Sequence, residues 1–255
     1  MMPMDIIHQF SLKLKELLFD AKGTCSDGLE NCRREICVLD DYNELKKVFG
    51  WELDPIIDDQ DLLKYRFAED VNNRRLRDFE SIATVVKNVA PEICLDIGTG
   101  SGSVAALMSI NAPDAEVNTV NIPPEEFEDG GTLTTIKLKR DEIGSYYKRR
   151  GLAGINQIFA NTKNWNPNFK KIDVAFIDGS HDIEFVVNDT MKIIKSMPPG
   201  SFILWHDFNL SLVNNYHWIK SVCLGVEQLY RNGVIKGRIF SIKNSWIGIY
   251  QVPSL

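Results

Sequence analysis

The strongest structural signal in this chain is the stretch Glu92-Ile-Cys-Leu-Asp-Ile-Gly-Thr-Gly-Ser-Gly-Ser-Val-Ala-Ala-Leu-Met108. Its first part, residues 92–97, is an apolar run that predicts a buried parallel strand, and its last part predicts a helix. Gly98, Gly100 and Gly102 lie between them and allow a sharp turn with backbone N–H groups open to a ligand. A strand, a glycine-rich turn and a helix in this order are typical of ligand-binding α/β folds.

The spacing of the glycines separates two classes of cofactor site. A dinucleotide fingerprint, G-x-G-x-x-G, needs glycine at position 103, where this chain has Ser103. The spacing here is G-x-G-x-G, with Asp96 two residues before the first glycine. The string D-I-G-T-G-S-G resembles the first motif of class I S-adenosylmethionine-dependent methyltransferases. A strand–helix turn that binds no ligand stays open as the alternative on this stretch alone.

This resemblance implies where S-adenosylmethionine would bind. In that family the glycines pass under the methionine portion and the ribose, and the acidic residue helps to hold the ammonium group through ordered water. The helix is predicted to begin near Ser101. The residues that match the motif, and that we expect around the cofactor, are Asp96, Gly98, Thr99, Gly100, Ser101 and Gly102.

Helical and extended patterns alternate along most of the chain, which predicts an α/β fold. After the first strand we expect strands at 116–122, 155–160, 172–177 and 202–205, then an antiparallel hairpin of 234–242 and 245–252. Helices are predicted at 74–89, 101–110, 184–195 and 214–230. Together these predict the Rossmann-like class I methyltransferase fold, with a seven-stranded, mostly parallel sheet and a C-terminal antiparallel hairpin.

The chain divides into residues 1–70, an N-terminal helical extension or lid, and residues 71–255, an S-adenosylmethionine-binding methyltransferase domain. The first part contains predicted helices at 6–21 and 42–49 but too little apolar periodicity for a core of its own. We therefore expect it to cover the substrate side of the sheet. The long connection 125–154 is either a second lid or a surface insertion.

Two motifs later in the chain resemble the small-molecule methyltransferases grouped as methyltransferase domain family 24. They are Phe-Ile-Asp-Gly-Ser-His, which ends at His181, and Pro-Gly-x-x-Ile-Leu-Trp-His-Asp, which ends at Asp207. The resemblance covers about residues 75 to 252. It implies that Asn121 stands where the family has an acid that binds the ribose hydroxyls, and Asn161 near the adenine.

Ligands of open parallel sheets bind beyond the carboxyl ends of the strands, so Asp96, Asn121, Asp178 and Asp207 should converge. Two carboxylates at the ends of adjacent strands repel unless something offsets their charge. One interpretation is a divalent metal site, with Mg²⁺, Mn²⁺ or Ca²⁺ held by oxygen ligands. Its predicted ligands are Asp178, Asp207 and a third group from Asn209 or His206.

The other interpretation needs no metal. His181 or His206 neutralises the pair, and one of them removes the proton of a hydroxyl that is to be methylated. The predicted catalytic residues are then His181, Asp178 and His206. Asp178 could also act only as a helix cap or turn residue.

Composition limits the partners. The net charge of −6 leaves no basic face for nucleic acid, and charged residues interrupt residues 1–19 too often for a signal peptide or membrane span. Five cysteines, an odd number, suit reduced thiols, so we expect a cytoplasmic protein with a small-molecule substrate, as a monomer or a homo-oligomer.

The main functional hypothesis is S-adenosylmethionine-dependent O-methylation of a small hydroxylated molecule, such as a sugar, a polyol or a phenolic natural product. A non-catalytic Rossmann-like nucleotide-binding module is the alternative, although such a module would not need the two histidines and two aspartates. A nicotinamide-dependent oxidoreductase is disfavoured by Ser103 and by the predicted closing hairpin.

Overall fold

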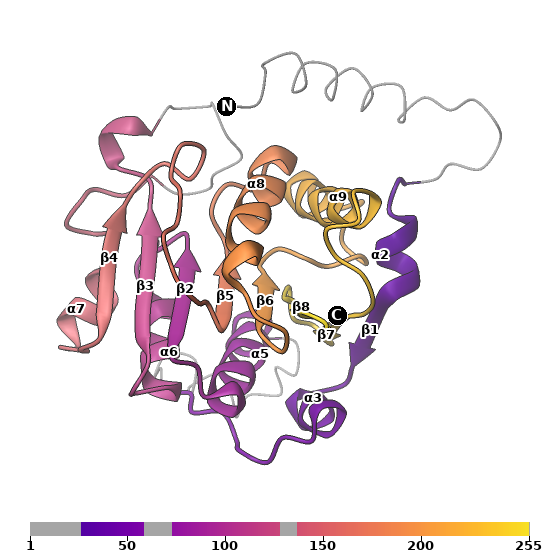
Figure 1. Cartoon of the computed structure of the whole chain (residues 1–255), viewed down its shortest axis with the longest axis horizontal. Helices are drawn as coiled ribbons and strands as arrows, with labels where there is room; N and C mark the ends of the chain where they lie inside the picture. The colour runs from indigo at the N-terminus through magenta and orange to yellow at the C-terminus, as the bar shows by residue number, and fades with distance from the viewer. Residues whose placement is uncertain (1–26, 59–72, 128–136, 255) are drawn as a thin grey trace.

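The computed structural model describes residues 27–58, 73–127 and 137–254, and these form one sheet of eight strands (Figure 1). All neighbouring strands are parallel except β8, which is antiparallel to β6 and β7. From one edge to the other the order is β1 (Ile36–Leu39), β7 (Ile239–Ile242), β8 (Gly248–Gln251), β6 (Phe202–Trp205), β5 (Val174–Ile177), β2 (Ile93–Ile97), β3 (Glu116–Asn121) and β4 (Ile155–Phe159).

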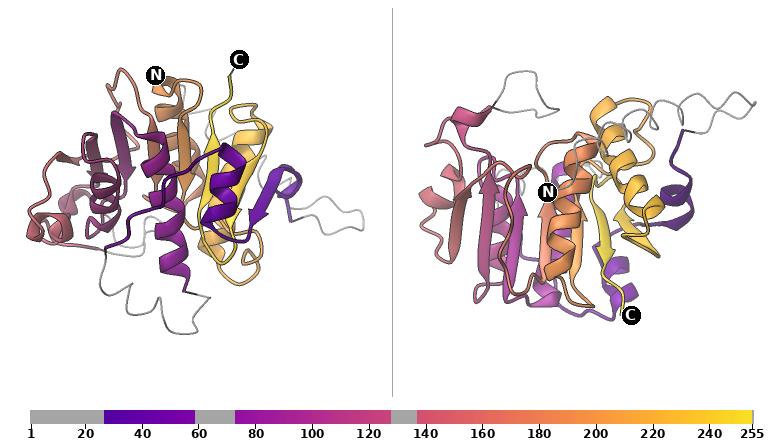
Figure 2. Two further views of the ribbon diagram at one scale, coloured as in Figure 1. Left: turned by 90° about the horizontal axis from the view of Figure 1, so that it is seen from below. Right: turned by 45° about the horizontal axis from the view of Figure 1, so that its top comes forward.

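Helices cover both faces of the sheet, as Figure 2 shows. One face carries α3 (Tyr42–Phe49), α5 (Arg74–Val89), α6 (Ser103–Asn111) and α7 (Ser145–Arg149). The other carries α2 (Glu30–Glu35), α8 (Ile183–Ile193) and α9 (His217–Arg231). Short 3-10 turns, η1 (Pro124–Glu126) and η2 (Ile194–Ser196), follow β3 and α8. Because both faces are covered, the central strands β5 and β6 are buried along their whole length, which explains their continuous apolar sequences.

The predicted mostly parallel methyltransferase-like sheet is confirmed, with one more strand than the seven expected. The extra strand, β1, lies at the sheet edge and pairs in parallel with β7, some 200 positions later in the chain. Its four residues, Ile36-Cys-Val-Leu39, are too few to show a strand periodicity.

The element boundaries agree best where caps are visible in the sequence. Helix α5 spans the predicted residues 74–89, because the Asn73 side chain accepts the N–H of Leu76 and Ala90 ends the helix in a left-handed conformation. Helix α6 begins at Ser103, two residues later than predicted, because the turn extends through Gly102 at φ 90°.

The described part of the N-terminal segment is built into the domain. Strand β1 extends the sheet, Leu45 of α3 is completely buried against α5, and α2 is joined to α9 by Glu227, whose Oε2 accepts the N–H of Cys32 at 2.9 Å. Residues 1–26 and 59–72, which include the predicted helix at 6–21, lie outside the described residues, so the predicted cover over the substrate side stays a prediction. None of the described helices is long and apolar enough to cross a membrane.

Candidate active site

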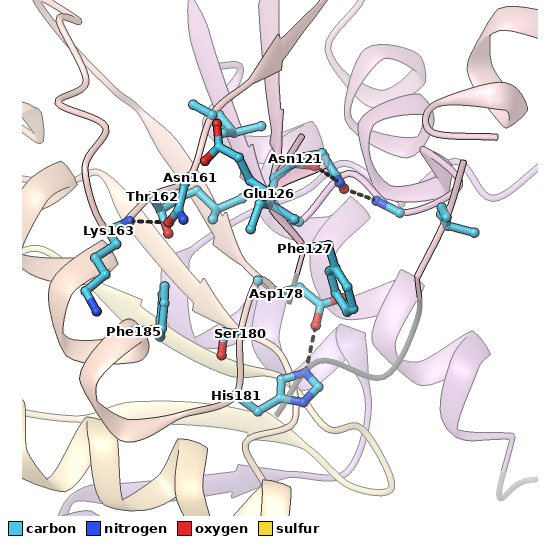
Figure 3. Close-up of a pocket in the computed structure, with 18 of the residues that line it drawn as sticks. Asn121, Glu126, Phe127, Asn161, Thr162, Lys163, Asp178, Ser180, His181 and Phe185 are labelled. Atoms are coloured by element: carbon cyan, nitrogen blue, oxygen red, sulfur yellow. Dashed lines mark hydrogen bonds and ion pairs between the residues drawn. The ribbon is translucent and has the colours of Figure 1, made fainter. Parts of the chain in front are cut away.

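A cavity of about 370 Å³ opens at the carboxyl edge of the sheet. It is lined by the residues that follow β2, β3, β4 and β5, by parts of the connection after β3, and by the start of α8 (Figure 3). Apolar side chains such as Phe127 and Phe185 alternate with polar ones such as Asn121 and Asp178. The volume and this mixture are typical of a small-molecule site.

Gly98 and Gly100 line the cavity for different reasons. A side chain at Gly98 would overlap the backbone carbonyl of Asp178, so this glycine allows the ends of β2 and β5 to approach each other. Gly100 has φ 51°, and a Cβ there would have no side chain within 4 Å. Gly100 therefore leaves space open above the turn.

Two asparagines contribute polar groups to the cavity. Asn121 accepts the N–H of Gly100 at 3.2 Å through Oδ1 and donates to the carbonyl of Ile122 at 2.9 Å, so it ties the end of β3 to the glycine turn. Asn161, after β4, accepts the backbone N–H of Lys163 at 3.0 Å. Both lie where the sequence placed them, beside the cavity.

The remaining motif residues lie outside the cavity lining. Ser101 is exposed, Gly102 packs against the ring of Tyr147, and the buried hydroxyl of Thr99 lies 2.7 Å from that of Thr119. Within the motif, Gly98 and Gly100 therefore face the cavity, whereas Thr99 and Gly102 are buried behind the turn.

Asp96 lies beneath the turn and is completely buried. Its Oδ2 accepts the hydroxyl of Thr119 at 2.7 Å, and Oδ1 has no partner among the described residues. Burial raises the pKa of Asp96 to about 7, because the Thr119 hydrogen bond offsets only part of the lost hydration and the charge of Asp178 adds to the shift.

Two aspartates and two histidines meet beside the cavity, at the ends of β5 and β6. The Nδ1 of His206 lies 2.9 Å from Asp178 Oδ1 and 3.4 Å from Asp207 Oδ2. The Nε2 of His181 lies 3.1 Å from Asp207 Oδ2 and 3.6 Å from Asp178 Oδ1. Figure 3 shows Asp178 and His181 directed toward each other. Each histidine thus bridges the two carboxylates that the sequence predicted to converge.

Asp178 and His206 shift each other's pKa in opposite directions. Burial alone would raise the pKa of Asp178, but the charges and hydrogen bonds of His206 and His181 outweigh it and lower the pKa to about 2. Burial would likewise lower the pKa of His206, and the charge and hydrogen bond of Asp178 reverse this and raise it well above its usual value. At neutral pH, Asp178 and His206 therefore form a carboxylate–imidazolium pair.

Helix α5 adds two groups that the sequence analysis missed. Asp78 Oδ2 lies 2.9 Å from the guanidinium of Arg74 and 3.5 Å from His206 Nε2, and Asp78 is buried. The signal in the sequence was weak: an acid between Leu76 and Phe79, on the apolar side of an amphipathic helix, with Arg74 one turn before it. Nothing in the motifs connects this helix with His206.

Three side chains of the cluster could together hold a cation. Asp178, His181 and Asp207 each offer a ligand atom, and the three atoms lie within 4.8 Å of one another. Asn209 is directed elsewhere: Oδ1 accepts from Ser211 and Nδ2 donates to the carbonyl of Ser245 at 3.1 Å. His181 therefore stands in the third position that the sequence analysis gave to Asn209 or His206.

Residue conformation at the end of β6 is also unusual. Asp207 has φ 54°, in the left-handed region that residues other than glycine seldom occupy. Its side chain is buried against both histidines. Such strained positions are concentrated at functional sites, where the surrounding structure holds them.

Comparison with known proteins agrees with this architecture. Residues 95–208 match the family model described as "Methyltransferase domain". No curated protein matches the sequence. The solved structures similar to this chain include the O-methyltransferase NovP, with 13% identity, a TM-score of 0.56, and coverage of 69% of this chain and 79% of that one.

Two further structures contain a bound cofactor. The O-methyltransferase TomG from Streptomyces achromogenes, involved in tomaymycin synthesis and solved with S-adenosylmethionine, has 13% identity and a TM-score of 0.53, and the match covers 84% of this chain and 97% of that one. Cofactor-bound Rv0187 from MTB has 17% identity and a TM-score of 0.51, with 75% and 88% covered. At these identities the likeness shows the shared fold.

Proposed function

We propose that this chain, whose residues 95–208 match the family model of a methyltransferase domain, transfers a methyl group from S-adenosylmethionine to a hydroxyl of a small molecule such as a sugar, a polyol or a phenol. The observation that carries the proposal is His181. It lines the cavity, and its Nε2 lies 3.1 Å from Asp207 Oδ2 and 3.6 Å from Asp178 Oδ1, so its ring stands between the cavity and both carboxylates.

The cavity suits the cofactor on its own geometry. Gly98 and Gly100 present backbone without side chains, and Asn121 and Asn161 offer polar groups at the ends of the next two strands. We assign Asn121 to the ribose, Asn161 to the adenine, and Asp96 to the ammonium group. When bound, S-adenosylmethionine would supply a methyl group on a positively charged sulfur, and the carbon–sulfur bond would break as an oxygen nucleophile bonds to the methyl carbon, with S-adenosylhomocysteine as the leaving group.

In this proposal His181 is the general base. In its neutral form, His181 accepts the proton of the acceptor hydroxyl as the hydroxyl oxygen attacks the methyl carbon. The charge that then appears on His181 is stabilised by Asp207 and Asp178, as a buried carboxylate stabilises the histidine of a hydrolytic triad. His206 does not line the cavity, and its raised pKa makes it an acid partner of Asp178 rather than a base.

His206 also bears on the metal hypothesis. Its Nδ1 already contacts both carboxylates, so the repulsion that suggested a cation is offset by the protein itself, and this favours the interpretation without metal. The second candidate, metal-assisted transfer, draws on the three converging ligands, which fit a divalent cation; such an ion would acidify a bound hydroxyl.

One experiment separates the two. Once an acceptor is found, methyl transfer is measured with and without excess chelator, in the wild type and in His181→Ala. We expect the chelator to leave the rate unchanged and His181→Ala to lower it about 10²- to 10⁴-fold, the usual contribution of a general base. His217→Ala, at an exposed histidine on α9, is the control. Loss of activity on chelation, restored by a divalent cation, would instead support the metal mechanism.

A further inference from the structure

A chain of hydrogen bonds runs beneath the glycine turn and joins α7 to Asp96. The hydroxyl of Tyr147 donates to Gln157 Oε1 at 2.9 Å, and Gln157 Nε2 donates to Thr99 Oγ1 at 3.0 Å. The hydroxyl oxygens of Thr99 and Thr119 lie 2.7 Å apart, and Thr119 donates to Asp96 Oδ2 at 2.7 Å. Four side chains thus link helix α7, which lies between β3 and β4, to the carboxyl group of Asp96.

The donors in this chain all point the same way. When Asp96 is ionised, Thr119 gives its one hydroxyl hydrogen to Asp96, so Thr99 must donate to Thr119 and receive from Gln157. The sequence of donors therefore begins at Tyr147 and ends at the carboxylate. Hydrogen bonds aligned in this way polarise one another, and each strengthens the next.

The ring of Tyr147 is held by two glycines. A Cβ at Gly102 would lie 2.5 Å from the ring, and a Cβ at Gly144 would overlap its phenol end, so neither position has room for a side chain. The backbone beside the ring is bound to the turn as well: the N–H of Gly144 donates to Gly100 at 3.1 Å, and that of Tyr146 to Ser101 at 2.9 Å. Helix α7 therefore supports the turn through a ring, a hydroxyl and the backbone.

We propose that Tyr147 and Gln157 are positioning residues for the cofactor. They act through Thr99, which is part of the turn, and fix the backbone of Gly98 to Gly102 in the conformation that receives the amino-acid end of S-adenosylmethionine. The proposal rests on the cofactor assignment made above. Neither residue lines the cavity, so both act from behind the site.

Two observations distinguish this role from ordinary packing. The ring alone would fill the space between Gly102 and Gly144, yet a hydroxyl is also present, and among the described residues its hydrogen-bond partner is Gln157. The chain also ends at an incomplete group, because Asp96 Oδ1 is buried without a partner among the described residues. A cationic group bound over the turn would compensate that charge.

The test is calorimetric titration with S-adenosylhomocysteine, combined with thermal unfolding. Tyr147→Phe keeps the ring between the glycines and removes only the first hydrogen bond. We expect about 3- to 10-fold weaker binding, the effect of one buried hydrogen bond. Gln157→Met should weaken binding at least as much. The double variant should weaken binding no more than Gln157→Met alone, because both changes interrupt the same series of hydrogen bonds. Tyr146→Phe is the matched control: it lies on the same helix, its hydroxyl is not part of this series of hydrogen bonds, and the variant should bind like the wild type.

The outcomes separate the two proposals. If the wild type does not bind S-adenosylhomocysteine, the cofactor assignment fails, and the positioning role fails with it. If the wild type binds and Tyr147→Phe binds equally well, even with a lower melting temperature, Tyr147 is only structural and the positioning proposal alone is overturned. Additive losses in the double variant would likewise contradict a single connected chain.

Discussion

Burial changes what a motif residue can do, and Asp96 is the clearest case. The motif implied a carboxylate near the cofactor, and the structure places the side chain beneath the turn, completely buried, with Oδ2 accepting the hydroxyl of Thr119. A short motif specifies the residue type but not its depth, because depth depends on neighbours from β3 and α7. The same limit applies to Thr99 and Gly102, whose sequence neighbours Gly98 and Gly100 do face the cavity.

The raised pKa of Asp96 gives a prediction for stability. A carboxyl group whose pKa is about 7 when folded, and near 3.8 when unfolded, favours folding at low pH and loses this contribution as the pH rises through 7. Between pH 4 and pH 7 the free energy of unfolding of the wild type should fall by up to about 4 kcal/mol relative to Asp96→Asn. Denaturant unfolding at several pH values measures this difference. The exposed Asp114→Asn is the control, and parallel curves for wild type and Asp96→Asn would refute the assignment.

The helices and strands that the sequence predicted most accurately are those with a clear hydrophobic pattern and clear end signals. Helix α5 was predicted to its end residues, and β6 likewise, because each has a long or fully apolar pattern and clear stops. Strand β1 could not be predicted, because four residues carry no period and their partner β7 is distant in sequence. The expectation of a helical extension therefore missed that the N-terminal segment completes the sheet edge.

Helix α3 tests whether this segment is part of the domain core. Leu45 is completely buried and Val48 on the same helix is 46% exposed. Leu45→Ala should lower the free energy of unfolding of the whole domain by about 2–5 kcal/mol, because it leaves a cavity between α3 and α5. Val48→Ala should change it by less than about 0.5 kcal/mol. A Leu45→Ala protein as stable as Val48→Ala would mean that residues 27–58 are an independent appendage.

Across the whole molecule, parallel topology explains why the sequence could predict that these side chains lie together. Asp178, Asp207 and both histidines follow adjacent parallel strands, and parallel topology alone brings them to one edge. Groups that reach the site from other layers could not be predicted this way. Asp78 comes from a helix about 100 residues earlier, and Tyr147 from a connection whose fold no motif specifies.

Binding of S-adenosylmethionine over the glycine turn can be measured by calorimetric titration with S-adenosylhomocysteine. The wild type should bind one equivalent, in competition with S-adenosylmethionine. Gly100→Val should abolish binding, because its side chain occupies the open space above the turn. Gly50→Val places the same side chain at a similar backbone angle, φ 67° against 51°, away from the cavity, and should bind normally. No binding by the wild type, or unchanged affinity in a folded Gly100→Val protein, would show that the cofactor does not bind over the glycine turn.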